Sequence, residues 1–107
     1  MNFEEFWPRY LRAHRDPRTR AMHVAGTIAA STLVFGALAL RKPWMIAAGL
    51  VAGYGPAWFS HAFIERNKPE TFSAPFASLR ADYVMAWHVL RGSIDDEIAR
   101  TQGATQV

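Results

Sequence analysis

Two long apolar stretches, separated by a three-residue break, dominate the pattern of hydrophobic and polar positions along the chain. Residues 22–40 form a run of 19 positions without a formal charge, and residues 44–64 form a second run of 21. Arg41, Lys42 and Pro43 lie between the two runs. About 20 apolar residues in a helix match the thickness of the hydrocarbon core of a bilayer. The pattern therefore predicts an all-α fold, a small membrane helical bundle built on an antiparallel transmembrane hairpin.

A soluble bundle with two buried helices is the alternative interpretation. With 107 residues, the chain has few others to cover two helices that are apolar on every side. Ala and Gly are frequent in both stretches, so their hydropathy is only moderate. We favour membrane insertion.

An amphipathic helix is expected before the hairpin. Four residues at helical spacing form its apolar face: Phe3, Trp7, Tyr10 and His14. Asn2 and Glu5 can cap the start of this helix, and Pro8 is expected to kink it or delay its start. Asp16 and Pro17 form a helix-start signal, so the helix of the first span is expected to begin near Pro17.

A second amphipathic helix is expected after the hairpin. Residues 67–74 have the composition of a loop, and Pro75 begins a helix that ends at Gly92. The apolar face of this helix comprises Phe76, Leu79, Tyr83, Ala86 and Leu90. Such a face fits either the membrane surface or the side of the hairpin. Residues 1–92 then form one helical membrane domain, and residues 93–107 a short acidic helix and flexible tail.

The distribution of charge sets the expected orientation. The chain carries 12 Lys and Arg against 9 Asp and Glu, a net charge of +3. Basic residues are concentrated before the first span and after the second, so the positive-inside rule places both termini in the cytoplasm. No basic run with interleaved aromatic residues indicates a nucleic-acid partner. The chain has no cysteine, which excludes disulfides and thiolate metal sites.

Hairpin geometry is expected to bring distant histidines together. His23 lies 19 residues before residue 42, the centre of the turn, and His61 lies 19 residues after it. Such positions have the same depth in an antiparallel hairpin, here near the cytoplasmic end. His14 closes the first helix, and a bend at Pro17 allows it to fold back toward His23. These three histidines are candidate metal ligands.

Glu65 completes the candidate ligand set. It follows His61 by four residues, so the two share a helical face. The small residues Gly49 and Gly53 continue that face and allow a close approach, either by the first span or by a second copy in a homo-oligomer. Three imidazoles and a carboxylate suit Fe(II) or Zn(II).

Two blocks of residues resemble a known family. The first block reads His14-x2-Pro17-x2-Arg20-x2-His23-x2-Gly26-Thr27. The second block reads Gly53-Tyr54-x2-Ala57-Trp58-x2-His61-x3-Glu65-x-Asn67-x-Pro69-x-Thr71-Phe72-x2-Pro75-x2-Ser78-Leu79-x2-Asp82-x2-Met85. Together they resemble the 2-hydroxy fatty acid dioxygenases of fatty-acid α-oxidation, whose small bacterial members were long described as a domain of unknown function. The resemblance covers about residues 3–91, although the fungal type has further apolar segments that this chain lacks.

The resemblance implies an integral membrane enzyme that uses Fe(II) and O2 to shorten a 2-hydroxy fatty acid by one carbon. The likeness to the small bacterial members implies a bacterial inner membrane as its location. The metal site that it implies comprises His14, His23, His61 and Glu65. Glu65 is also the candidate catalytic group. Arg20 is expected to pair with the substrate carboxylate, and Asn67 and Asp82 are expected to support the ligand residues.

Two other functions remain open at this point. The first is a non-enzymatic membrane protein in which the histidines and Glu65 form a structural polar network. The second is a zinc site for lipid hydrolysis, which neither a nucleophile nor an HExxH motif supports.

Overall fold

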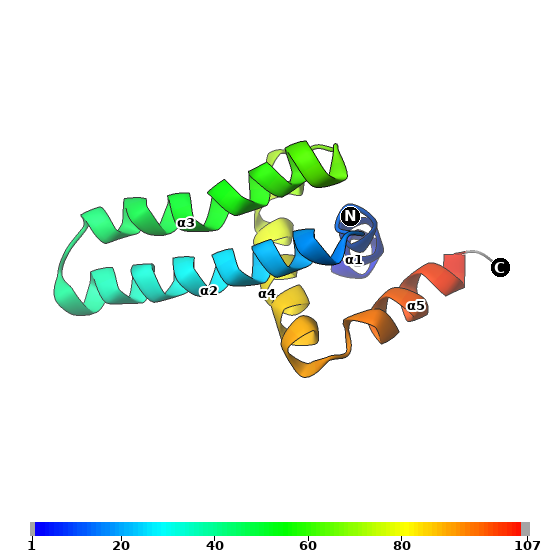
Figure 1. Cartoon of the computed structure of the whole chain (residues 1–107). Coiled ribbons are helices and arrows are strands. Elements are labelled where there is room, and N and C mark those ends of the chain that lie inside the picture. Colours follow the sequence, from blue (N-terminus) through cyan, green and yellow to red (C-terminus); the bar gives the residue numbers. More distant parts are fainter. Residues whose placement is uncertain (1, 106–107) are drawn as a thin grey trace.

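The structure is a computed structural model that describes the backbone of residues 2–105 and the side chains of residues 2–102. Its elements, in chain order, are α1 (Phe3–Arg12), α2 (Pro17–Leu40), α3 (Trp44–Ser60), the π-helical turn η1 (His61–Glu65), the 3-10 turn η2 (Glu70–Phe72), α4 (Pro75–Arg91) and α5 (Ile94–Thr105). The described residues contain no strand, so the prediction of an all-α fold is confirmed. Figure 1 shows α2 and α3 as a long hairpin, with the remaining helices gathered at its open end.

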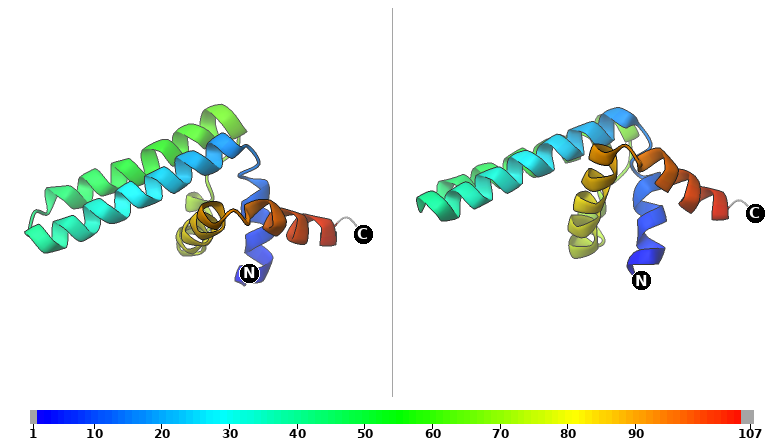
Figure 2. Two further views of the ribbon diagram at one scale, coloured as in Figure 1. Left: turned by 60° about the horizontal axis from the view of Figure 1, so that its bottom comes forward. Right: turned by 90° about the horizontal axis from the view of Figure 1, so that it is seen from below.

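Helices α2 and α3 lie antiparallel and side by side in every view (Figures 1 and 2). Helix α2 begins at Pro17, as predicted, and Arg41 ends it in the left-handed region with φ 54°. The glycines let the two backbones approach closely. A Cβ atom at Gly26 would lie 3.1 Å from the carbonyl oxygen of Ala52, and one at Gly49 would lie 3.2 Å from that of Ala30. The small-residue stripe is thus used for packing within the hairpin.

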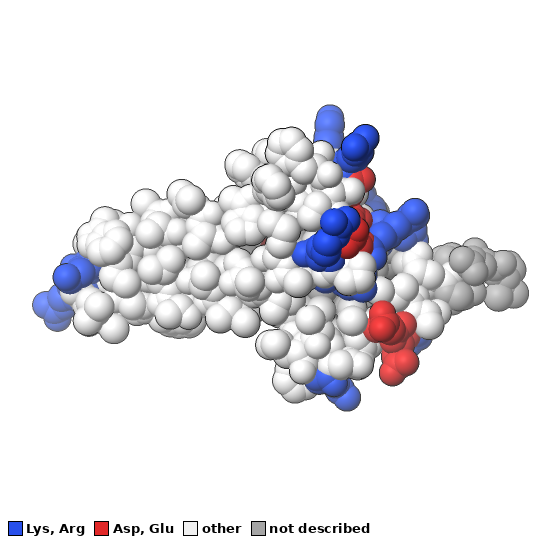
Figure 3. All heavy atoms as spheres, viewed as in Figure 1, with Lys and Arg blue, Asp and Glu red and all other residues white. Residues whose placement is uncertain are grey.

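The surface of the hairpin is apolar along its length. Figure 3 shows lysine and arginine side chains at the tip and at the base, with an uncharged face between them. Large apolar side chains are exposed there, including Phe35, Leu38 and Val51. Among the described residues, α2 alone is long and apolar enough by itself to cross a membrane; α3 has 17 residues. The structure therefore shows the hairpin and one candidate span, and crossing by both helices remains a prediction.

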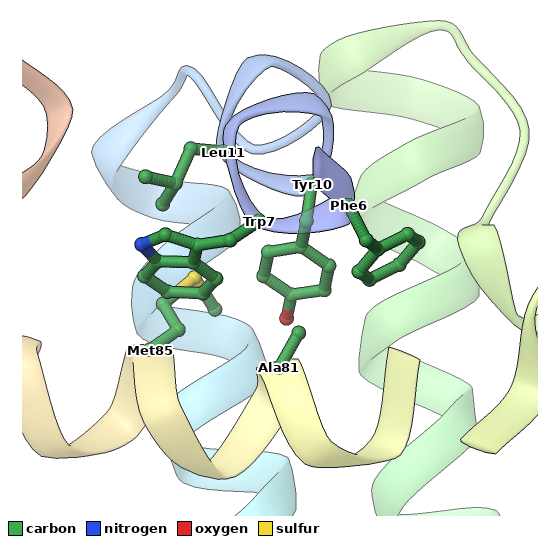
Figure 4. Packing of buried hydrophobic residues seen from close by; sticks show 6 residues of the cluster. All are labelled: Phe6, Trp7, Tyr10, Leu11, Ala81 and Met85. Carbon is green, nitrogen blue, oxygen red and sulfur yellow. The ribbon is translucent and has the colours of Figure 1, made fainter. Parts of the chain in front are cut away.

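The core lies between α1 and α4. The buried residues of this core are Phe6, Trp7, Tyr10 and Leu11 of α1 with Ala81 and Met85 of α4 (Figure 4). Asn2 caps α1 as predicted, because its Oδ1 accepts a hydrogen bond of 2.9 Å from the amide of Glu5. Pro8 does not delay the start of the helix, which runs from Phe3 to Arg12 with the proline inside it. Burial of the aromatic face offsets the missing backbone hydrogen bond of the proline.

Helix α4 crosses the base of the hairpin and α5 lies near α1 (Figure 2). The buried side of α4 is built from small residues and Met85, whereas most of the predicted apolar stripe is exposed, with Phe76 87% and Leu90 68% accessible. Helix α5 reaches Thr105, further than the short helix expected, and residues 106 and 107 lie outside the described residues. The indole of Trp7 donates to Glu97 on α5 at 3.0 Å, which ties the C-terminal helix to the core.

Candidate metal centre

Three buried histidines from three different segments converge at the base of the hairpin. His14 follows the last turn of α1, His23 lies in the second turn of α2, and His61 opens η1. Nε2 of His14 lies 3.1 Å from Nε2 of His23 and 3.1 Å from Nε2 of His61. The three rings are nearly perpendicular to one another, with interplanar angles of 84–90°. The predicted convergence of His14, His23 and His61 is therefore what the structure shows.

The other ring nitrogen of two of these histidines faces a backbone carbonyl. Nδ1 of His14 lies 2.6 Å from the carbonyl oxygen of Tyr10, and Nδ1 of His23 lies 2.9 Å from that of Thr19. In both cases the carbonyl belongs to the residue four positions earlier. A carbonyl oxygen can only accept, so Nδ1 carries the proton and donates. In neutral imidazole this leaves the lone pair on Nε2, the atom that faces the other histidines.

Nδ1 of His61 also faces an oxygen acceptor, which here belongs to a side chain. Its Nδ1 donates to Oδ1 of Asn67 at 2.6 Å. The orientation of that amide is set by its other end, because Nδ2 of Asn67 donates to the carbonyl oxygen of Ala13 at 3.2 Å. The predicted supporting role of Asn67 thus has a concrete geometry: it orients His61 and connects it to the segment that carries His14.

Three lone pairs that face one another require a positive charge between them. A further proton on His14 is disfavoured, because burial lowers the pKa of His14 well below its usual range and the nearby His23 lowers it further. A metal ion bound by imidazole nitrogens at about 2.0–2.1 Å separates neighbouring ligand atoms by roughly 3–3.5 Å. The three ligand nitrogens lie within 4.8 Å of one another. The donor set therefore fits Zn(II) or Fe(II), both of which accept neutral imidazole.

The segment that carries His61 is a π-helical turn. The amide of Arg66 donates to the carbonyl oxygen of His61, five residues earlier, and the amide of Asn67 donates to the same oxygen at 2.9 Å. Arg66 itself adopts a left-handed conformation with φ 58°. Such turns occur frequently at functional sites because they redirect a side chain within a helix. The expectation of a regular α-helix through residue 64 is corrected here: α3 ends at Ser60, and the π turn follows.

Glu65 binds the segment between α1 and α2. Its carboxylate accepts hydrogen bonds from the amide of Arg15 at 2.7 Å, the amide of Asp16 at 3.1 Å and the hydroxyl of Thr19 at 3.0 Å. The group of described residues that could hold a metal comprises the three histidines and does not include Glu65. These contacts favour an anchoring role, because they hold the chain bend that brings His14 over His23.

Arg20 also lies at this bend. Its Nη1 donates to the carbonyl oxygens of His14 and Arg15, both at 2.9 Å, and its side chain is buried. Arg20 is not among the described residues that line the cavity beside the histidines. The structure thus gives its guanidinium backbone partners, and the expected contact with a substrate carboxylate has no counterpart in the cavity wall.

Asp82 reaches the site from α4. It lines the same cavity as the histidines, and its Oδ1 accepts a short hydrogen bond from the hydroxyl of Tyr10. The ring of Tyr10 stacks on the imidazole of His14, with ring centroids 4.0 Å apart. Burial raises the pKa of Asp82 to about 6, while the hydrogen bond from Tyr10 opposes the shift. These contacts link Asp82 to His14 through Tyr10, and the supporting role expected for Asp82 stays a prediction.

A cavity of about 320 Å³ opens beside the histidines and continues along the groove between α2 and α3. Its volume lies at the lower end of the range of about 300–1,000 Å³ typical of small-molecule sites. Polar side chains of α4 and η2, such as Ser78, Asp82 and Thr71, line it together with apolar residues of the hairpin. A ligand in this cavity would contact the metal-binding nitrogens and an apolar wall at the same time.

Sequence reasoning missed three contributors to the site. Tyr10 and Thr19 supply the carbonyl groups that orient His14 and His23, and Ala13 supplies the carbonyl that orients Asn67. These acceptors are backbone carbonyl groups, which every residue has, so no residue type in the sequence pointed to them.

One family model, described as Mpo1-like: 2-hydroxy-palmitic acid dioxygenase Mpo1-like, matches residues 1–94. The matched segment contains all three histidines of the cluster and ends at the first residue of α5. No curated protein and no solved structure matches the chain at a significant level.

Proposed function

Since the chain belongs to the Mpo1-like family of 2-hydroxy-palmitic acid dioxygenases, we propose that it is an Fe(II)-dependent membrane enzyme that uses O2 to shorten 2-hydroxy fatty acids by one carbon. The observation that carries the proposal is the convergence of three Nε2 atoms whose Nδ1 partners are all acceptors. Fe(II) held by His14, His23 and His61 would supply the activation of O2.

The chain's own residues provide orientation and shape. Tyr10, Thr19 and Asn67 hold the three imidazoles in one tautomer, which supports metal affinity from outside the ligand set. Glu65 and Arg20 hold the bend before α2, so that His14 stays over the end of the hairpin. The carboxylate and hydroxyl of the substrate would lie at the histidine end of the cavity, beside the three imidazoles.

A membrane location is supported by two features. The hairpin exposes apolar side chains over its length without a charged residue between its tip and its base. The exposed face of α4, with Phe76, Tyr83 and Leu90, crosses the base of the hairpin and suits the interface between lipid and water. We propose that the hairpin enters the bilayer and that the histidine cluster lies near the cytoplasmic interface.

Metal content and product analysis test the proposal together. The protein is purified anaerobically in detergent, loaded with Fe(II), and incubated with 2-hydroxy palmitate and O2. We expect one bound iron per chain and a product that is one carbon shorter. A protein that binds iron and forms no shortened product would refute the dioxygenase function. A protein that binds no metal would favour the structural polar network.

A further inference from the structure

We infer that the groove between α2 and α3 is an acyl-chain track that opens to the lipid at Phe35 and Leu50, so that the protein recognises a minimum chain length and imposes no maximum. The inference rests on the proposed function and deepens it by specifying which 2-hydroxy acids fit. It is carried by the course of the cavity, the order of its lining residues and the exposure of its far end.

The cavity follows both helices of the hairpin in the same direction. On α2 its lining runs from His23 to Phe35, and on α3 and η1 it runs from His61 back to Gly49. These ranges span 12 residues on each side, or roughly 18 Å at the helical rise of 1.5 Å per residue. A cavity that starts at the histidines and extends this far is elongated, which fits a single extended chain better than a compact ligand.

Polarity changes along the track. The histidine end is lined by Asp82 and Ser78, whereas the far end is lined by Val34, Phe35 and Leu50. A ligand that fills the track therefore needs a polar group at one end and a hydrocarbon chain at the other. A 2-hydroxy fatty acid has this distribution, with both of its oxygen-bearing carbons at one end.

The far end is open. Phe35 is 70% and Leu50 54% accessible, although both line the cavity. Helix α4 covers the track as far as Ser31, four residues before Phe35, where the hydroxyls of Ser31 and Tyr83 lie 2.6 Å apart. A chain longer than the covered part would leave between Phe35 and Leu50 and continue into the surrounding lipid. Additional methylenes would then add no contact with the protein.

A single cysteine provides the probe, because the chain has none of its own. Leu50→Cys places a thiol at the mouth of the track, and Val51→Cys is the matched control, since Val51 is the next residue, 72% accessible and not part of the cavity lining. Both variants are treated with a thiol reagent in detergent in the presence of 2-hydroxy octanoate, 2-hydroxy palmitate or a longer 2-hydroxy acid. We expect 2-hydroxy palmitate and longer acids to slow labelling of Leu50→Cys at least about tenfold at saturation. 2-hydroxy octanoate should have little effect on this rate. None of the acids should slow labelling of Val51→Cys.

Turnover by the same variants provides a second readout. A bulky group attached to Leu50→Cys after folding should lower kcat/KM for 2-hydroxy palmitate at least about tenfold relative to the unlabelled protein, as overpacking predicts. The same label should change kcat/KM for 2-hydroxy octanoate by less than about twofold. For each substrate, kcat/KM of the labelled protein is divided by that of the unlabelled protein, because the substrate partitions into detergent equally in both measurements.

The outcomes separate this inference from the proposed function. If the protein shortens 2-hydroxy acids and labelling of Leu50→Cys is equally protected by short and long acids, the track is wrong and the function stands. If long acids are rejected where palmitate is accepted, the far end is closed and the inference is overturned. If long acids protect Leu50→Cys and no acid is shortened, the track is supported and the dioxygenase function falls.

Discussion

Nε2 of His61 lies 3.1 Å from Nε2 of His14, and both atoms are acceptors because the Nδ1 atoms of these residues donate to Asn67 and to the carbonyl of Tyr10. Two lone pairs at this distance repel each other unless a cation lies between them. His23 adds a third nitrogen on the same side. The cluster is thus unfavourable by itself and favourable around a metal ion, which links the stability of the protein to metal binding.

Substitution of a cluster histidine should abolish metal-dependent stabilisation. We expect wild-type protein to bind one equivalent of Fe(II) or Zn(II) and to gain several degrees in its unfolding midpoint at saturating metal. His23→Ala and His61→Ala should bind no stoichiometric metal and show no such gain. His88→Ala is the matched control, since His88 bonds Ser93 outside the cluster. Metal analysis and thermal unfolding measure both effects, and a midpoint that rises with metal in His61→Ala would contradict the site.

Asn67 should control metal affinity without being a ligand. Removing the acceptor that orients His61 in Asn67→Ala is expected to weaken metal binding about 10–100-fold. Asn67→Asp keeps an acceptor at the same place and should retain more of the affinity. Competition with a chelator of known affinity measures the difference. Equal metal affinities of wild type and Asn67→Ala would remove Asn67 from the site.

Glu65 should stabilise the bend rather than bind the metal. In Glu65→Gln one oxygen and the side-chain shape remain, but the charged acceptor of three donors is lost. We expect the free energy of unfolding to fall by about 1–3 kcal/mol, with one metal still bound at saturation. Denaturant unfolding and metal analysis test the two parts separately. Complete loss of metal from folded Glu65→Gln would instead identify the carboxylate as a ligand, as the sequence had suggested.

Asp82 should make stability depend on pH. Because burial raises its pKa from 3.8 to about 6, the folded state holds this proton more tightly than the unfolded state does. The stabilisation from Asp82 is therefore full below about pH 4 and is lost as the pH rises to about 6. Asp82→Asn stays uncharged and keeps an oxygen that can accept from Tyr10.

The comparison is made on metal-free protein, so that metal release at low pH does not contribute. Asp82→Asn should be more stable than wild type at pH 7, by on the order of 2–3 kcal/mol, and close to it at pH 4. Denaturant unfolding followed by tryptophan fluorescence provides the free energies. A difference between the two proteins that is constant across this pH range would show that Asp82 has the same pKa in both states.

Membrane topology can be tested with single cysteines at the two ends of the hairpin. Lys42→Cys lies in the turn and Lys68→Cys follows the π turn at the base. We expect a membrane-impermeant thiol reagent added to intact cells to label Lys42→Cys only, and both variants to react after permeabilisation. Labelling of neither position in intact cells would argue against a hairpin that crosses the bilayer.

The sequence alone predicted the hairpin and the three histidines that cluster at its base. Two uncharged runs on either side of Arg41, Lys42 and Pro43 require antiparallel helices, and equal distances from the turn place His23 and His61 at one depth. Pro17 and the residues before it predicted the bend that returns His14. These are local and periodic properties, because helix starts, helix lengths and depth along an axis follow from residue order alone.

The tertiary structure decided which nitrogen atoms face one another in the histidine cluster and which charged groups lie outside it. Glu65 and Arg20 carry charges suited to a ligand and to a substrate contact. The partners of Glu65 are backbone amides near the bend and the hydroxyl of Thr19. Arg20 donates to backbone carbonyls at the bend and lies 4.0 Å from the carboxylate of Asp95. The π turn at His61 and the exposure of the apolar stripe on α4 were likewise decided by packing. Side-chain direction at a junction of several helices depends on the relative positions of all of them, and no spacing within a single helix contains that information.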